Sequence, residues 1–136
     1  MADKLKLEMV TPYKRVLSED VDEITAPGFI GELGILPEHT PLLTTLKVGE
    51  LSYKEGNETF HIAVNWGYLE VENNTVTVLV DTAERADEID LARAKAALGH
   101  AEDALKGLSQ EDKKYMIMEA ALQRALIRIQ VAGKNR

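Results

Sequence analysis

The sequence contains no cysteine among its 136 residues. Without thiols the chain has no disulfide scaffold, no CxxC redox site and no zinc site with thiolate ligands, which is typical of a reducing compartment. No apolar run approaches the roughly 18 residues that a membrane-spanning helix needs. The residues from Met1 to Lys6 lead into a strand-like alternation instead of forming a signal segment. We therefore expect the protein to stay in the compartment where it is made.

Motifs of the common catalytic and metal sites are missing as well. The three histidines, His39, His61 and His100, stand singly, and no HExxH, GxSxG or GxxxxGK(S/T) motif occurs. A metal centre, a nucleophile elbow and a phosphate-binding loop therefore have no support. The one hydrolase hypothesis uses a carboxylate pair, Asp81 and Glu84. Two acids at a strand-to-helix junction are equally expected from the helix dipole.

Acidic residues outnumber basic ones, but the two are unevenly distributed along the chain. The net charge is −7, from 16 basic and 23 acidic residues, which disfavours non-specific nucleic-acid binding. After Glu119 there is no acid, and the last 17 residues carry four basic side chains: Arg124, Arg128, Lys134 and Arg136. This basic tail predicts an acidic partner surface, and for Arg124 and Arg128 the alternative is a solvated helix face.

Residues 4–80 carry the alternation of apolar and polar side chains that is typical of strands. Residues 55–57 (EGN) predict a hairpin turn between strands 48–54 and 60–64, and residues 73–74 (NN) predict a second tight turn. Short strands at this spacing favour a β-sandwich or barrel, and the length allows one ordinary domain or two small ones.

Two finer predictions concern the last strands of this region. The apolar positions change parity near Gly67, which predicts a β-bulge there. Residues 76–80 (VTVLV) are almost continuously apolar, which predicts a strand buried on both faces.

From Asp87 onward the apolar period becomes helical and proline disappears, so we place a boundary at residues 84–88. Two seams with spacings of three and four residues predict an antiparallel helical hairpin: Leu91, Ala94, Leu98, Ala101, Leu105 and Leu108, then Tyr115, Met118, Leu122, Ala125, Ile129 and Ala132. Gly107 ends the first helix, and Ser109, three residues before Asp112, resembles an N-cap of the second. Alanine buries little area, so we expect a weakly held hairpin that can open.

Four segments in order resemble one known family. Residues 27–43 (PGFIGELGILPEHTPLL) are similar to the GExGILPGHAPL signature of the epsilon subunit of F-type ATP synthases. Residues 67–71 (GYLEV), 76–83 (VTVLVDTA) and 89–94 (IDLARA) resemble its GGFLEV, VTVLADTA and IDxxRA motifs. The resemblance extends over essentially the whole chain.

The chain departs from the family pattern at a few positions. Glu38 stands where the family usually has Gly, Thr40 where it has Ala, and residues 65–66 (NW) where it has Ser-Gly. We therefore expect the loop around Glu38 and the predicted bulge to be shaped differently here.

The resemblance implies a non-catalytic stalk subunit of the α+β class. An N-terminal antiparallel β-sandwich, residues 1–86, would hold the gamma subunit and rest on the c-ring through Glu32, Gly34 and His39. An antiparallel two-helix hairpin, residues 87–136, would extend toward the alpha and beta catalytic subunits and inhibit ATP hydrolysis. Arg124, Arg128 and Lys134 would make that inhibitory contact. The implied location is the cytoplasmic face of the bacterial plasma membrane, peripheral and through the complex.

No cofactor is expected, except that some members of this family bind regulatory ATP. Glu84, Asp90 and Arg93 match their motif, but His100 occupies the position of a second arginine. A neutral imidazole does not replace a fixed, forked cation against phosphate, and Asp90 and Arg93 also suit a helix start. The alternative to the whole assignment is a β-sandwich adaptor whose helical hairpin dimerises.

Overall fold

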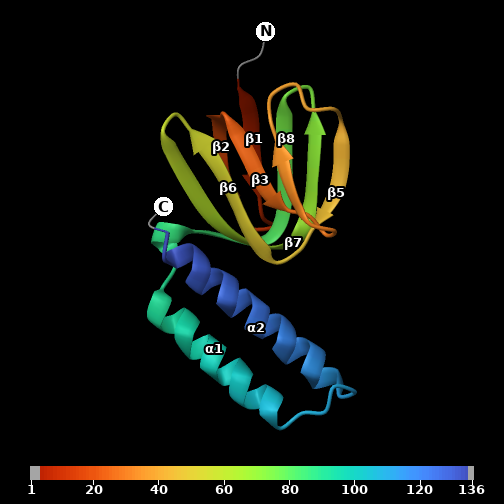
Figure 1. The fold of residues 1–136 in the computed structure, drawn as a ribbon, viewed down its shortest axis with the longest axis vertical. Helices are drawn as coiled ribbons and strands as arrows, with labels where there is room; N and C mark the ends of the chain where they lie inside the picture. Colours follow the sequence, from red (N-terminus) through yellow and green to blue (C-terminus); the bar gives the residue numbers. More distant parts are fainter. Residues whose placement is uncertain (1–3, 135–136) are drawn as a thin grey trace.

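The computed structural model describes residues 4–134, in which strands come first and helices follow (Figure 1). The strands are β1 (Leu5–Val10), β2 (Arg15–Val21), β3 (Glu23–Pro27), β4 (Glu32–Ile35), β5 (Leu42–Leu46), β6 (Gly49–Glu55), β7 (Glu58–Glu72) and β8 (Thr75–Arg85). A short 3₁₀ helix, η1 (Ala86–Glu88), leads into α1 (Leu91–Lys106) and α2 (Lys113–Ala132). The predicted α+β fold class is confirmed.

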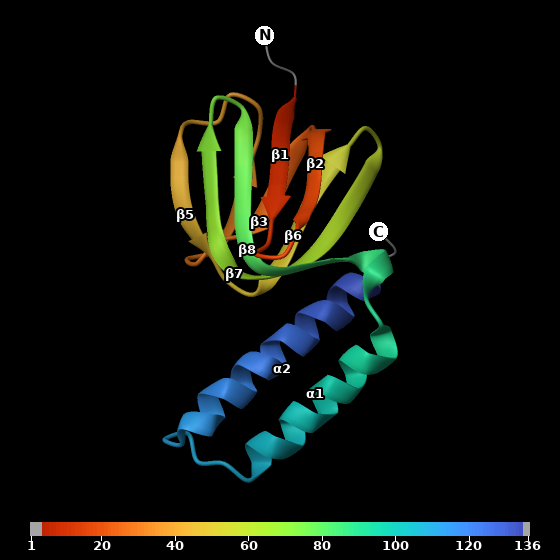
Figure 2. The same cartoon turned by 180° about the vertical axis from the view of Figure 1, so that it is seen from behind.

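The strands form one hydrogen-bonded network that folds over itself into a sandwich (Figures 1 and 2). The order is β2-β1-β8-β7-β6-β3-β4, and β5 pairs with the second half of β7. The 15 residues of β7 and the 11 of β8 run through both layers. All described pairings are antiparallel except that of β1 with β8, which is parallel.

The change of layer explains the change of parity in β7. Val64 faces the core before the change and Leu69 after it, so the inward side switches from even to odd positions. Trp66, between them, has a φ of +41°, and it is skipped in the pairing of β7 with β8. The register of β7 with β8 is the same before and after Trp66, so neither strand has an inserted residue and the predicted bulge is wrong. Instead, the paired strands twist together at this point, and the opposite side of β7 then faces the core.

A glycine is required at position 67, where β7 and β8 twist together and their backbones come close. A Cβ atom at this position would lie 1.9 Å from the backbone oxygen of Leu79 on β8. No side chain, however small, fits such a close approach of two backbones.

Both predicted turns are confirmed. Gly56 has a φ of +65° between the paired residues Glu55 and Glu58. Asn73 and Asn74 have φ values of +49° and +58°, as expected when a two-residue turn joins β7 to β8.

The prediction that residues 76–80 are buried on both faces is wrong. Val76, Val78 and Val80 point into the core, whereas the Leu79 side chain is 49% exposed and Thr77 is half-buried. Apolar residues on the outer side of β8 mimic a buried strand in sequence. The face they make is open in the isolated chain.

The helices begin and end close to their predicted caps. Gly107 ends α1: its N–H donates to the carbonyl group of Ala104, and the N–H of Leu108 donates to that of Leu105. Asp112, not Ser109, is the N-cap of α2, because its carboxylate accepts the N–H of Lys114. Ser109 instead accepts the N–H of Glu111 in the connecting turn, so that detail of the prediction is wrong.

The seam between α1 and α2 is built on alanine. Ala94, Ala101 and Ala125 are buried, while Leu91, predicted to lie on the seam, is 39% exposed. The other predicted seam residues are half-buried, as expected for a pair of helices with no third layer. Neither α1 nor α2 is long and apolar enough to cross a membrane.

Candidate functional site

The candidate site is the junction, the surface where α2 lies against β6, β7 and β8. α2 lies between the sandwich and α1, and its C-terminal end is the part nearest to η1 (Figure 2). Its apolar part is small: Ala63, Ala86 and Val131 are buried together, with Ile89 and Ile127 partly buried against them. Val131 is therefore on a second, sandwich-facing side of α2 that the predicted seam did not include.

An ion pair holds one side of the junction. Glu84, near the end of β8, lies 2.7 Å through Oε1 from Nε of Arg128, and Nη2 of Arg128 donates to Oε2 at 3.3 Å. The Arg128 side chain is only 24% exposed. The interpretation of this part of the tail as a solvated helix face is therefore wrong for Arg128.

A second acid, Glu50 on β6, lies on the other side of the junction. Lys134 Nζ lies 2.8 Å from Oε1 and 3.0 Å from Oε2, and Gln130 donates to Oε1 at 3.1 Å. His61 Nδ1 is 2.8 Å from Oε2, and because an ionised carboxylate only accepts, this nitrogen donates. Burial raises the pKa of Glu50, but the hydrogen bonds from Lys134, His61 and Gln130 outweigh it and leave the pKa below its usual range.

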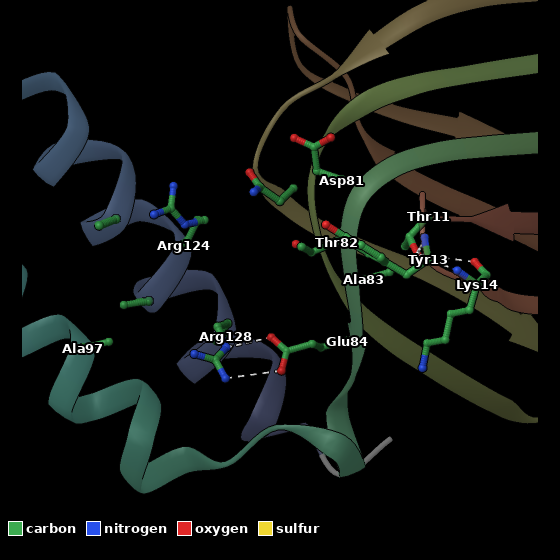
Figure 3. Close-up of a pocket in the computed structure, with 13 residues that line it drawn as sticks. Thr11, Tyr13, Lys14, Asp81, Thr82, Ala83, Glu84, Ala97, Arg124 and Arg128 are labelled. Carbon is green, nitrogen blue, oxygen red and sulfur yellow. Dashed lines mark hydrogen bonds and ion pairs between the residues drawn. The ribbon is translucent and has the colours of Figure 1, made fainter.

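Between the two parts of the molecule lies a cavity of about 510 Å³. Figure 3 shows Arg124 and Arg128 of α2 on one side, with Asp81, Thr82 and Glu84 of β8 on the other. The Asn65 side-chain oxygen is buried here and has no hydrogen-bond partner among the described residues. Side chains of both charges line the cavity, together with alanines of α1, α2 and β8.

The residues that the resemblance assigned to ATP are only partly brought together. Glu84 lines the cavity, but its carboxylate is engaged by Arg128. Asp90 is the N-cap of α1 and accepts the backbone N–H of Arg93, as the simpler interpretation of this pair requires. The described lining residues of the cavity include neither Asp90 nor Arg93.

The residues assigned to the c-ring contact lie on and after β4. Glu32 and Gly34 are exposed on this short strand, which, among the strands that the structure describes, pairs with β3 alone. His39 lies in the following loop, half-buried, with Nδ1 2.7 Å from the Thr40 carbonyl oxygen. A contact surface here would therefore consist of an edge strand and the loop that follows it.

The carboxylate pair of the hydrolase hypothesis lines the same cavity but differs in environment. Asp81 is exposed, whereas Glu84 is held by Arg128. Arg136, the last member of the basic tail, lies outside the described residues. Sequence reasoning missed Glu50, His61 and Gln130. Glu50 and His61 lie on the outer face of β6 and β7, where polar residues are ordinary, so the sequence carries no signal there for a partner such as Gln130 on a distant helix.

Two family models together cover almost the whole chain. Residues 4–86 match the model described as ATP synthase, Delta/Epsilon chain, beta-sandwich domain, and residues 87–133 match its long alpha-helix domain. The chain belongs to the ATP synthase delta/epsilon family. This confirms the resemblance read from the sequence motifs.

Relatives in this family are similar over nearly their full length. The ATP synthase epsilon chain of Geobacter metallireducens is 70% identical over 135 residues, which cover 99% of this chain and 98% of that one. The epsilon chain of Geobacter sulfurreducens is 69% identical over 134 residues, covering 98% and 97%.

Solved structures agree with the delta/epsilon fold. A chain of the Euglena gracilis mitochondrial ATP synthase structure, which contains OSCP, F1 and c-ring, superposes with a TM-score of 0.83 at 24% identity, covering 97% of this chain and 82% of that one. A chain from the central stalk and c-ring of Tetrahymena thermophila ATP synthase gives 0.58 at 20% identity, covering 96% and 95%. At these identities the likeness concerns the fold.

Proposed function

We propose that the chain is a non-catalytic subunit of the central stalk of an ATP synthase, where its sandwich binds the gamma subunit and the c-ring and supports the coupling of ion translocation to ATP synthesis. The observation that carries this proposal is the match of both parts of the chain, in order, to one family. The proposal includes a peripheral location at the cytoplasmic face of a bacterial plasma membrane, where the complex would hold the chain.

The hairpin is the regulatory part of the proposal. In the closed form, Arg128 and Lys134 are bound to Glu84 and Glu50 of the sandwich. An inhibitory contact of the same cations with the alpha and beta subunits therefore requires the hairpin to leave the sandwich. The apolar cluster that opposes this is small, and its buried members are two alanines and one valine. Exposing so small an apolar surface to water costs only about a few kcal/mol of free energy, so the hairpin can leave the sandwich.

The sandwich is the anchoring part of the proposal. Glu32, Gly34 and His39 are the residues proposed for the c-ring contact, and the exposure of Glu32 and Gly34 supports it. Figure 1 shows the sandwich and the helical hairpin as two separate parts of the molecule, and β4 belongs to the sandwich through its pairing with β3. A β-sandwich adaptor unrelated to a rotary motor is the competing account.

Reconstitution tests both parts. The full chain is added to ATP synthase depleted of its own epsilon chain, from a close relative such as Geobacter sulfurreducens. We expect it to co-purify with the complex and to lower the rate of ATP hydrolysis. Failure to bind would support the adaptor account, whereas binding without slower hydrolysis would remove only the inhibitory role.

Regulatory ATP is a second candidate, favoured by the two arginines that line the cavity. Binding through Glu84, Asp90 and Arg93 would require Glu84 to release Arg128. Calorimetry of the isolated chain with ATP tests this, and substitution of Arg93 by alanine should abolish any binding observed. Equal heats for the two proteins would exclude these residues as the nucleotide site.

A further inference from the structure

Glu50 is the most enclosed charged group of the junction. Its side chain is 13% exposed, and its two oxygens lie within hydrogen-bonding distance of three side chains. Gln130 lies in the last turn of α2, Lys134 lies two residues beyond its end, and His61 comes from the neighbouring strand β7. The acid is therefore shared between the anchoring and the moving parts of the chain.

The position of Glu50 makes it more than a surface ion pair. Exposed pairs contribute little because water screens both charges, whereas the Glu50 side chain is only 13% exposed while the hairpin covers it, so its attraction to Lys134 is screened less. Lys134 is the only lysine or arginine among the described residues that forms an ion pair with Glu50. Departure of α2 takes away Lys134 and Gln130 together, and only His61 remains.

His61 has a distinct part in this arrangement. It lies on the sandwich with Glu50, so its hydrogen bond persists when the hairpin leaves. By donating to Oε2 it fixes the orientation of the carboxylate. Oε1 is then turned toward Gln130 and Lys134. His61 is in this sense a positioning residue.

From these contacts we propose that Glu50 is an internal competitor for the cation at the end of α2 and sets the proportion of closed hairpin. An acidic partner surface gains Lys134 only by taking it from Glu50, so the strength of this one contact determines how readily the inhibitory form appears. The effect on inhibition rests on the proposed function. The contact of Glu50 with Lys134, which we call the latch, is a property of the isolated chain.

The test measures hairpin position in the full-length chain. Because the sequence has no cysteine, two can be introduced for spin labels, at the exposed positions Glu72 on the sandwich and Gln110 in the helix connection. Double electron–electron resonance then gives the distribution of distances. In the Glu50→Gln variant, which keeps the shape and removes the charge, we expect the ratio of closed to open molecules to fall about tenfold or more.

A matched control and a second variant keep the test decisive. Glu23→Gln breaks a pair with Lys54 that lies wholly within the sandwich, and it should leave the distribution unchanged. Lys134→Gln changes an accessible residue beyond the end of α2, so it opens the hairpin without affecting the core. Because both substitutions remove the same contact, the double variant should be no more open than Glu50→Gln alone.

Two results would overturn the proposal: a Glu50→Gln distribution equal to that of Glu23→Gln, or full additivity of the Glu50 and Lys134 substitutions. The inhibition assay on the reconstituted complex then distinguishes failure of the latch from failure of the proposed inhibitory role. If Glu50→Gln opens the hairpin but hydrolysis is unchanged, the latch holds and the inhibitory role fails. If the wild-type chain inhibits but Glu50→Gln neither opens the hairpin nor inhibits more strongly, the latch fails alone.

Discussion

Asn74 holds Glu38 by two hydrogen bonds across 36 positions of the chain. Its Oδ1 accepts the backbone N–H of Glu38 at 2.6 Å, and its Nδ2 donates to the Glu38 carboxylate at 3.2 Å. Glu38 has a φ of +71°, a left-handed conformation that costs a residue with a side chain roughly 1–2 kcal/mol. The turn between β7 and β8 therefore holds the loop that carries His39.

This contact predicts the effect of exchanging its polar atoms. Asn74→Asp keeps the turn residue and the acceptor but places a second carboxylate against Glu38. We expect a loss of about 1 kcal/mol in the free energy of unfolding and faster hydrogen exchange over residues 36–41. Adding Glu38→Gln, which supplies an amide donor, should reverse both effects. The control is Asn73→Asp, and equal effects of the two aspartates would contradict the account.

Two glycines should respond to alanine in opposite directions. Gly67→Ala forces the backbones of β7 and β8 apart and should lower the free energy of unfolding by more than about 2 kcal/mol. Gly99 lies inside α1, and a Cβ there meets nothing within 4 Å, so Gly99→Ala should raise it by about 0.5–1 kcal/mol. Denaturant unfolding of the two variants measures both. Tolerance of alanine at position 67 would show that the backbones of β7 and β8 do not come close there.

The turns and caps could be predicted because they depend on neighbouring residues. Glycine and asparagine are the residue types that most readily adopt the positive φ of a tight turn, as Gly56, Asn73 and Asn74 do. Glycine is also common where a helix ends, as Gly107 does at the end of α1. Glu38 is the converse case. The sequence marks it as a departure from the family's glycine, but only the structure shows that Asn74 accommodates it.

The junction could not be predicted because its partners are remote in sequence. Glu50 and Lys134 are 84 positions apart, and nothing local in either segment refers to the other. The prediction that residues 76–80 are buried on both faces failed for a related reason. Leu79 is apolar and exposed, so composition indicates burial that the isolated chain does not provide.

The depressed pKa of Glu50 predicts a specific acid sensitivity. A carboxylate whose folded pKa lies below its ordinary value of 4.5 stabilises the fold above that pH, and the stabilisation is lost as the pH falls through the folded pKa. Unfolding free energies measured from pH 6 to pH 3 should fall less steeply for Glu50→Gln than for the wild type. Parallel curves would mean that Glu50 is not held ionised by its three partners.

The proposed c-ring contact predicts a charge effect without a stability effect. Glu32 is exposed at the start of β4, so Glu32→Lys should leave the unfolding transition within about 0.5 kcal/mol of the wild type. The same substitution should reduce retention of the chain by the c-ring-containing complex in co-purification. Glu102→Lys, an exposed acid on α1, is the control. Equal retention of the two variants would place the contact elsewhere on the sandwich.

The central claim is that the sandwich anchors the chain while the hairpin leaves it to inhibit, and a reversible disulfide tests it most directly. Ala63 and Val131 are buried together in the junction, so cysteines at both positions of the otherwise cysteine-free chain should tie α2 to β7 when oxidised. In the reconstituted ATP synthase, we predict unrestrained ATP hydrolysis in the oxidised state and inhibition after reduction, with no such change for the wild-type chain. Equal inhibition in both states would contradict the claim.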